Sequence, residues 1–459
     1  MSARRSAAAL RRLLRVLLAT TLLVVLATAW VLWRNFEGEE PVRAREGSTL
    51  RQGEAGGPPQ GDGGTQPPAD AATLARGEYL ARAGNCLGCH TARGGEPGAG
   101  GRAIATPFGT VYSSNLTPDA DTGLGRWSAS EFRRALRHGR SRDGRLLTPA
   151  FPYPNFTRVT REDADSIYAW VMSRPAVKRP NRPHDLRFPY GLQAALAVWR
   201  ALYFRTEPFV PDPARSAAWN RGSYLVNGLG HCMACHAARN FLGGTVQGPE
   251  AGGAIVSAQH WYAPSLADAR EAGVADWALE DVVALLQTGT SPRGTAMGPM
   301  AEVVARSTQH LAQGDLRAMA EYLRTLPPAA AAAAATAPSA TAAAAARRPP
   351  GWAETMERGR QVYEAHCTGC HGPQGEGTPG IRALAGHRAV VLDTPHNVIQ
   401  AIRHGGFAPA TPGNPRPFGM PPFRALLSDD EVAAVASHVR GSWGNDAGIV
   451  QPLDVWRAR

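Results

Sequence analysis

The chain has 459 residues, 44% of them hydrophobic, and its 49 lysines and arginines outnumber its 38 acidic residues to give a formal net charge of +11. This length suggests about three domains. A basic surface can indicate nucleic-acid binding, but the arginines beyond the first fifteen residues are scattered rather than clustered. We therefore predict a solvated basic surface and no nucleic-acid partner.

The N-terminus combines arginines with an apolar run. Five arginines within residues 4–15 precede the run Val16–Trp33, whose 18 residues are just enough to span a bilayer. Arginines on the inner side predict that the rest of the chain lies outside. A cleavable signal peptide is the alternative, because Ala27-Thr-Ala29 resembles a cleavage site. We predict an uncleaved signal anchor over residues 1–34, since Trp30 and Trp33 continue the apolar run as interfacial aromatics.

Two stretches are predicted to be linkers. Residues 35–71 are rich in Gly, Pro, Glu and Gln without an apolar period, which is typical of a disordered tether. Residues 328–350 are mainly alanine, with prolines at both ends and in the middle that favour a linker over a helix. No such break divides residues 72–327. The halves of that stretch are expected to pack together, whereas the part after the second linker is more loosely attached.

One pentapeptide pattern, Cys-x-x-Cys-His, occurs three times, and it is the attachment pattern of c-type haem. Two cysteines one helical turn apart can form thioethers to the vinyl groups of one haem, and the adjoining histidine then lies under the iron. The sequence therefore predicts three covalently bound haem c groups. Their attachment residues are Cys86, Cys89, Cys232, Cys235, Cys367 and Cys370, with His90, His236 and His371 as proximal iron ligands.

Zinc sites and thioredoxin-like redox pairs are the alternatives to haem. Structural zinc usually takes four protein ligands, and a redox pair needs no adjoining histidine. The chain has six cysteines and the three motifs use all of them, so none remains for a disulfide. Haem is attached covalently on the outer side of the bacterial inner membrane. The chain is therefore expected at that membrane, with its haem-binding part in the periplasm.

A second pattern repeats around the haem motifs. Arg-Gly followed by an aromatic residue precedes each motif, in Arg76-Gly77-Glu-Tyr79, in Arg221-Gly222-Ser-Tyr224 and in Arg358-Gly359 with Tyr363. An acidic helix start with an apolar helical period follows each motif, at residues 163–170, 315–323 and 429–439. We expect each glycine to let the first and last helix of its unit cross closely, with aromatic side chains filling the contact.

A short helix before the haem and a longer helix at the end is the layout of a small cytochrome c domain. The predicted fold is all-α, with three tandem class I cytochrome c domains after the N-terminal membrane helix. The predicted domains span residues 72–212, 213–327 and 351–448, and residues 449–459 are predicted to be a tail.

Further stretches carry a family resemblance from about residue 73 to the C-terminus, outside the alanine-rich linker. They include Thr106-Pro-Phe-Gly-Thr110, Ser114-Asn-Leu-Thr-Pro-Asp119, Gly298-Pro-Met-Ala-Glu-Val303 and Ser442-Trp-Gly-Asn445. In these the chain resembles the triheme cytochrome c subunit of membrane-bound periplasmic dehydrogenases. That family serves alcohol, gluconate and sorbitol dehydrogenases, and also molybdenum-containing aldehyde or N-heterocycle dehydrogenases.

The resemblance implies an electron-transfer subunit and not an enzyme. Such a subunit takes electrons from a catalytic partner of the molybdenum, flavin or quinone type and passes them to ubiquinone or to a terminal cytochrome or oxidase. Two alternatives stay open on the sequence. One is a cytochrome c subunit of a respiratory oxidase, and the other is a catalytic multihaem enzyme such as a peroxidase.

Methionines in loops supply the candidates for the sixth iron ligand, because methionine ligation raises the reduction potential of a haem. Met420 lies in a loop rich in proline and glycine, eight residues before Ser428, where no amphipathic stripe needs it for packing. It is predicted to ligate the third haem. Met300 holds the matching place for the second haem, with Met297 as the substitute.

The first haem departs from this pattern. Many members of the family carry methionine in a Pro-Ala-Met-Pro-Tyr stretch, but here the stretch is Pro149-Ala-Phe151-Pro-Tyr153. Phenylalanine cannot ligate iron, so the sixth ligand is left unknown, with Met172 and His138 as candidates. Within the resemblance, the phenylalanine form points to a partner of the molybdenum type.

Overall fold

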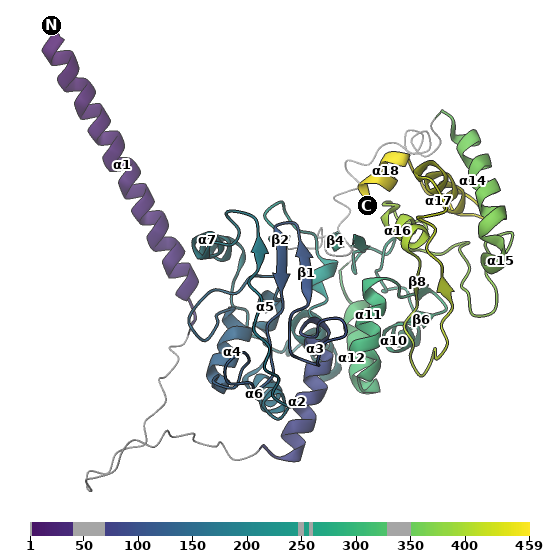
Figure 1. Ribbon diagram of the computed structural model, residues 1–459, viewed down its shortest axis with the longest axis horizontal. Helices are drawn as coiled ribbons and strands as arrows, with labels where there is room; N and C mark the ends of the chain where they lie inside the picture. Colours follow the sequence, from purple (N-terminus) through teal and green to yellow (C-terminus); the bar gives the residue numbers. More distant parts are fainter. Residues whose placement is uncertain (1, 40–68, 247–251, 257–259, 328–349) are drawn as a thin grey trace.

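The structure is a computed structural model that describes residues 2–39, 69–246, 252–256, 260–327 and 350–459 (Figure 1). Below, the first, second and third segments are residues 72–212, 213–327 and 351–459. The predicted linkers at residues 35–71 and 328–350 lie almost wholly outside the described residues. Where the first of them is described, Asn35 and Phe36 still belong to a helix, so the linker prediction was wrong at that end.

Helix α1 (Ser2–Phe36) is the only helix in the described part of the chain that is long and apolar enough to cross a membrane, over Leu13–Phe36. It projects away from the body of the protein, and only its C-terminal end reaches the first segment (Figure 1). There it packs against α7 (Gln193–Tyr203), a helix that the sequence analysis did not predict.

The first segment holds its haem motif between two long helices. Along the chain follow α2 (Ala71–Ala83), α3 (Cys86–Cys89), α4 (Ala129–His138), α5 (Tyr153–Phe156), α6 (Arg161–Met172) and then α7. Strands β1 (Ala103–Thr106), β2 (Gly109–Tyr112) and β3 (Asp185–Leu186) form one antiparallel sheet in that order.

The second segment repeats this arrangement. Its first helix is α8 (Ala217–Ser223), which continues as one π-helical stretch, η1 (Tyr224–Leu229), and leads to α9 (Met233–His236). Then come α10 (Leu279–Thr288), α11 (Pro299–Arg306), the 3-10 turn η2 (Thr308–His310) and α12 (Gln313–Arg324). Its hairpins pair β4 (Ala254–Val256) with β5 (Trp261–Ala263) and β6 (Thr290–Ser291) with β7 (Gly294–Thr295).

The third segment contains α14 (Trp352–His366), α15 (Thr368–His371), α16 (His396–His404), α17 (Asp429–Gly441) and α18 (Pro452–Arg457). Its strands β8 (Gly406–Phe407) and β9 (Gly419–Met420) form a hairpin. Helix α18 corrects the prediction of a tail, because its Val455 and the adjoining Ala458 are buried in the core of this segment.

The prediction of an all-α fold was right in the main and wrong in detail. The fold is mostly helical, but every segment also carries short antiparallel strands of two to four residues. Such strands are too brief to show an alternating pattern in the sequence. In the first of these hairpins Gly109 has a φ of +125°, which a residue with a side chain rarely adopts.

In each segment the helix before the haem motif crosses a later long helix at a glycine, and each predicted helix pair packs in this way. Helix α2 packs on α6, α8 on α12 and α14 on α17. A Cβ atom added to Gly77, Gly222 or Gly359 would run into a backbone carbonyl of the facing helix, at Ser166, Ala318 and Ala434 respectively. Any side chain at these positions would therefore push the two helices apart.

The first and second segments share one hydrophobic core, and the third has a core of its own. A pair of exchanged hydrogen bonds reinforces the shared core. Asp163 of the first segment accepts from its own Arg76 Nε at 3.0 Å and from the second segment's Tyr224 hydroxyl at 2.6 Å. In the second segment, Asp315 takes the place of Asp163 and binds a tyrosine of the first segment.

There Asp315 accepts from its own Arg221 Nε at 2.9 Å and from the first segment's Tyr79 hydroxyl at 2.7 Å. Burial works against ionisation of Asp315, but the hydrogen bonds from Arg221 and Tyr79 outweigh it and lower the pKa of this carboxyl group. Each segment therefore completes the polar cluster of the other. We call these two clusters the exchanged Tyr–Asp pairs.

Within the described residues, the third segment has no counterpart to these pairs. Gln361 stands where Tyr79 and Tyr224 stand in the other segments, two residues after the crossing glycine. Its aromatic residue, Tyr363, instead donates to the carbonyl of Gly372 within the same segment at 2.6 Å.

Polar contacts nevertheless attach the third segment to the second. The amide side chain of Asn397 exchanges two hydrogen bonds with the backbone of Tyr262, each 2.8 Å long. In addition, Arg388 Nη1 donates to the carbonyl of Gly273 at 2.6 Å.

The exchanged pairs lead to a stability prediction. Tyr224→Phe removes a hydroxyl group from a buried carboxylate, and hydrogen bonds to charged groups contribute about 1.5–3 kcal/mol. The matched control is Tyr168→Phe, whose hydroxyl donates to the neutral carbonyl of Trp127 at 2.5 Å within one segment and is worth about 0.5–1.5 kcal/mol. Denaturation of the haem-loaded chain should show the larger loss for Tyr224→Phe. An equal or smaller loss would contradict the assigned role of the exchanged pairs.

Candidate haem sites

Each Cys-x-x-Cys-His motif forms a short helical turn after the first long helix of its segment. The amide of the histidine donates to the carbonyl of the first cysteine in all three, from His90 to Cys86 at 3.0 Å, from His236 to Cys232 at 3.0 Å and from His371 to Cys367 at 2.9 Å. This single turn brings the two thiols and the imidazole together, as thioether attachment and iron ligation require. None of the six cysteines forms a disulfide.

Two of the three histidines are oriented through their Nδ1 atoms. His90 Nδ1 lies 2.7 Å from the carbonyl oxygen of Ser114, and His236 Nδ1 lies 2.7 Å from that of Pro264. A carbonyl oxygen can only accept, so the proton belongs on Nδ1 and the lone pair on Nε2 is free for a metal. The Nδ1 atom of His371 is buried and has no hydrogen-bond partner among the described residues.

The protonation state of the histidines also suits iron ligation. Burial lowers the pKa of His90, His236 and His371, because desolvation disfavours the charged imidazolium. The neutral imidazole is the form that binds a metal.

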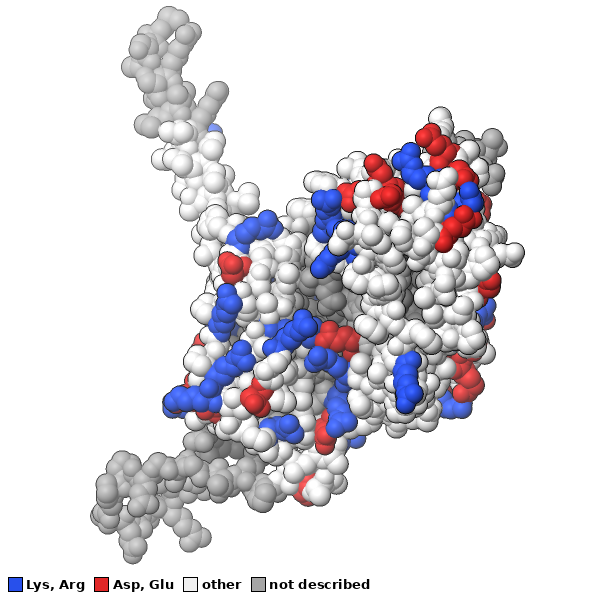
Figure 2. Space-filling view, turned by 45° about the vertical axis from the view of Figure 1, so that its right-hand side comes forward, with Lys and Arg blue, Asp and Glu red and all other residues white. Residues whose placement is uncertain are grey.

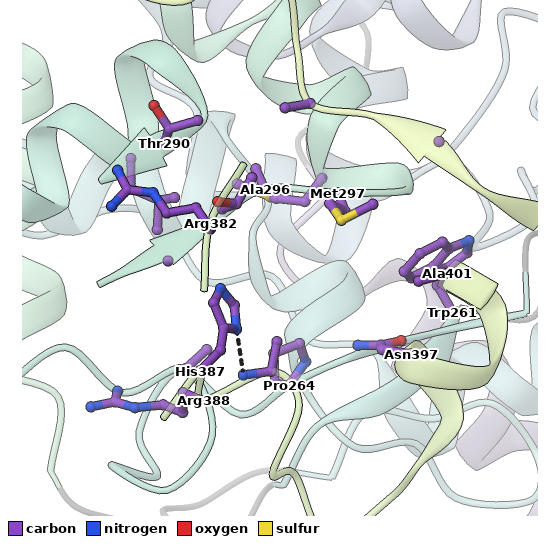
Figure 3. Close-up of a pocket in the computed structure, with 18 of the residues that line it drawn as sticks. Trp261, Pro264, Thr290, Ala296, Met297, Arg382, His387, Arg388, Asn397 and Ala401 are labelled. Atoms are coloured by element: carbon purple, nitrogen blue, oxygen red, sulfur yellow. Dashed lines mark hydrogen bonds between the residues drawn. The ribbon is translucent and has the colours of Figure 1, made fainter. Parts of the chain in front are cut away.

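The second and third haem motifs open into one cavity of about 1040 Å³. It is lined by Cys232, Cys235 and His236 from the second segment and by Cys367, Cys370 and His371 from the third. Figure 3 shows labelled residues of both segments around it, among them Trp261 and Met297 from the second and Asn397 and Arg388 from the third. The structure therefore brings two of the three predicted sites together.

The candidate methionine ligands of these two sites also line the cavity. Met300 lies in the first turn of α11 and lines the cavity. Gly298, just before this helix, is packed so tightly that a Cβ atom on it would lie 2.6 Å from the Trp261 ring. Met297 lines the same cavity, so both candidates for the second site stay available. Met420 reaches the cavity from β9.

The polar groups of the cavity fit a haem with its two propionate carboxylates. Trp277 Nε1 and Thr295 Oγ1 are buried at the cavity wall without a hydrogen-bond partner among the described residues, and buried donors of this kind usually have an acceptor. The guanidinium groups of Arg293 and Arg388 lie 5.6 and 5.5 Å from the centre of the Trp277 ring. Both guanidinium groups share the carboxylate of Asp276, at 3.1 and 3.5 Å. Two cations against one carboxylate, with two free donors, leave room for further carboxylates.

The sequence analysis missed these two cations and two donors. Trp277 could have been found, because it precedes the central helix of its segment as Trp127 does in the first segment. Arg388 carries no such signal, since it reaches the cavity of the second segment from the third. Charged side chains elsewhere are interspersed in sign on the face shown in Figure 2, in agreement with the predicted scattered charge.

The first haem motif has no methionine at the expected ligand position. Phe151, which replaces the expected methionine, packs on the shared core with its ring 5.4 Å from that of Phe156. Met172, in the last turn of α6, packs on the same core. Cys86 of the first haem motif packs on that core as well, so both residues lie in the same cluster as the motif.

His138 lies in a different environment. It ends α4, is buried, and its carbonyl accepts a hydrogen bond from Arg200 Nη1 at 2.6 Å. Burial, together with several nearby arginines, lowers the pKa of His138 to about 4. The side chain is thus neutral at physiological pH, but its surroundings are the arginines that join α1 to the first segment.

Comparisons with known proteins agree with this geometry. The cytochrome c family model matches residues 74–175 and 356–443. The cytochrome c subunit of the quinone alcohol dehydrogenase of Gluconobacter oxydans (strain 621H) is 37% identical over 403 residues, which cover 85% of this chain and 83% of that protein.

Two further relatives serve other dehydrogenases. The cytochrome c subunit of gluconate 2-dehydrogenase from Pantoea cypripedii is 35% identical and covers 83% of this chain and 87% of its own length. A nicotinate dehydrogenase subunit from Pseudomonas putida is 40% identical over 83% of this chain, which matches 31% of that larger protein. The chain therefore belongs to the family of cytochrome c subunits of membrane-bound dehydrogenases, and it is an electron carrier rather than a catalytic subunit.

Proposed function

We propose that the chain carries three covalent haem c groups, in three cytochrome c domains, and passes electrons from a periplasmic dehydrogenase to ubiquinone or a terminal cytochrome or oxidase. The observation that carries this proposal is the repeated unit of a glycine crossing, a Cys-x-x-Cys-His turn and a half-buried histidine whose pKa is lowered by desolvation. The middle unit lies outside the family match at residues 74–175 and 356–443, yet it has the same helix pair and the same turn.

The proposed iron ligands are the three motif histidines, with Met300 on the second haem and Met420 on the third. A bound haem accepts and releases one electron at a time. The chain's own part is to fix the imidazole planes through the carbonyls of Ser114 and Pro264, and to shield the sites within apolar walls. The common cavity would bring the second and third haems close together, which favours direct exchange of electrons between them.

The partner is proposed to be a dehydrogenase whose catalytic centre lies on another polypeptide. Phe151 points to a partner of the molybdenum type, and the 40% identity to the nicotinate dehydrogenase subunit is in line with an N-heterocycle substrate for that partner. Retention of α1 would anchor the complex in the inner membrane, with the haem-binding part in the periplasm.

Haem content is the first test. Pyridine haemochrome analysis after acid–acetone extraction should give three covalent haems per chain, because thioether bonds survive denaturation. Replacing the second cysteine and the histidine of one motif, as in Cys235→Ser with His236→Ala, should remove one haem. The same pair of changes at the third motif serves as the control. Two or fewer covalent haems per unaltered chain would contradict the proposal of three haem sites.

The ligand of the first haem can be tested by Phe151→Met. The change should add one methionine-ligated signature in magnetic circular dichroism and raise the potential of one haem, since methionine ligation raises the potential. Phe156→Met, at a ring 5.4 Å away, is the matched control and should do neither. If the unaltered protein already shows three equivalent haems with His and Met ligands, the inference from Phe151 is wrong and Met172 becomes the residue to replace.

Electron transfer itself can be measured with the purified chain. Alone, it should be reducible by dithionite but should not oxidise alcohols, aldehydes or sugars, because it contributes no catalytic centre. Together with its dehydrogenase it should deliver electrons to a quinone analogue. Substrate turnover by the isolated chain, or peroxide reduction at enzyme-like rates, would favour a catalytic multihaem protein instead.

A further inference from the structure

An apolar surface lies beside the end of α1. Its members are exposed aromatic and aliphatic side chains on α7, on the loop before α7 and on one loop of the second segment. We call it the α7 patch, and it consists of Phe188, Tyr190, Leu192, Val198, Leu202 and Phe241. Phe188 is 84% exposed and Phe241 is 87% exposed, which is costly in water for side chains of this size.

The members of the patch form one surface. Phe241 sits in a loop that is tied to α7 by a hydrogen bond of 2.8 Å from Trp199 Nε1 to the carbonyl of Leu242. Tyr190 stacks on Phe108 of the neighbouring hairpin, with ring centres 4.5 Å apart. These two contacts tie the Phe241 loop to α7 and Tyr190 to the neighbouring hairpin.

The outer side of α7 is apolar, whereas its inner side buries Leu196, Ala201 and one arginine. Its single charged residue, Arg200, is only 3% exposed and points inward. Its outer side instead carries Val198 and Leu202, four residues apart, at 46% and 49% exposure. A helix that faces water normally has polar residues outside and apolar residues inside. This arrangement fits a helix whose outer side faces lipid.

A buried polar network holds α7 against the end of α1. Asn35 of α1 is 6% exposed and donates from Nδ2 to the carbonyl of Ala197 in α7 at 2.9 Å. Arg200 Nε donates to Asn35 Oδ1 at 3.0 Å, and Arg140 Nη2 donates to the Asn35 carbonyl at 3.0 Å. Fully satisfied buried networks of this kind are rigid. The direction of α1 therefore fixes where α7 lies relative to any membrane that α1 enters.

We propose that the α7 patch inserts into the outer surface of the same bilayer that α1 spans, so that the first segment lies on the lipid and does not hang from a tether. The patch begins next to Asn35, and the apolar span of α1 ends at Phe36. Trp30 and Trp33, both exposed, mark the interfacial level of α1. Exposed Arg187 and Arg205 flank the patch in sequence, where they can meet lipid phosphates.

This inference rests on the proposed retention of α1 as an anchor, and the test separates the two. The haem-loaded full chain is reconstituted into phosphatidylcholine vesicles that contain a photoactivatable phosphatidylcholine, and labelled residues are located by mass spectrometry. Label in α1 and in residues 188–202 and 241 supports the proposal. Label in α1 alone overturns the patch while leaving the anchor intact. A protein that does not enter the vesicles, or that starts at Trp30, overturns both.

A charge variant sharpens the test. Val198→Glu with Leu202→Glu should lower labelling of residues 188–202 at least severalfold, leave labelling of α1 unchanged and leave the haem spectrum unchanged. The matched control is Leu453→Glu, a 50% exposed apolar residue of the third segment on α18, far from α7 in Figure 1; it should change nothing. If the complex with the dehydrogenase loses the lipid label on the patch and gains crosslinks to the partner, the occupant is a protein and the proposal is wrong.

Discussion

The close crossing of α2 with α6, of α8 with α12 and of α14 with α17 is the constraint on which the rest of the structure depends. Each crossing has a glycine on the helix before the haem motif, at Gly77, Gly222 and Gly359. The facing helix comes so close that only a hydrogen atom fits at the glycine Cα. The short Cys-x-x-Cys-His turn follows directly from the end of the helix that carries the glycine. The crossing therefore sets where the thiols and the proximal histidine lie.

The three segments use this common plan for different attachments. The first is joined to α1 through Asn35, Arg140 and Arg200. The second shares a core with the first on one side and a cavity with the third on the other. The chain is thus arranged from the N-terminal apolar helix α1 outward, with the second segment in the middle. In the proposed function this order also allows electrons to pass between the second and third haems inside one protein.

The sequence predicted what is encoded locally. The spacing of cysteines and histidine, the repeated Arg-Gly pattern and the acidic helix starts all act within a few residues, and the structure has a turn or a helix at each of them. Features that depend on distant residues were missed. Helix α7 gave no usable signal because its charged residue faces a partner more than 160 positions away in the chain. Arg388 was missed for the same reason, because it contacts Gly273 and Trp277 of the second segment. Helix α18 was missed because Val455 and the adjoining Ala458 form too short an apolar pattern to indicate burial.

The exchanged Tyr–Asp pairs decide how this chain can be divided. Cutting it between the first and second segments would leave Asp163 without the hydroxyl of Tyr224, and Tyr79 without Asp315, while opening the core that both segments share. Each fragment would expose apolar side chains of the shared core, together with a carboxylate, Asp163 or Asp315, that has lost one of its hydrogen bonds. The first two segments therefore constitute a single folding unit that holds two of the Cys-x-x-Cys-His motifs, whereas the third segment closes its own core and bonds Tyr363 within itself. A shortened redox protein made from this sequence has to retain both of the first two segments or neither.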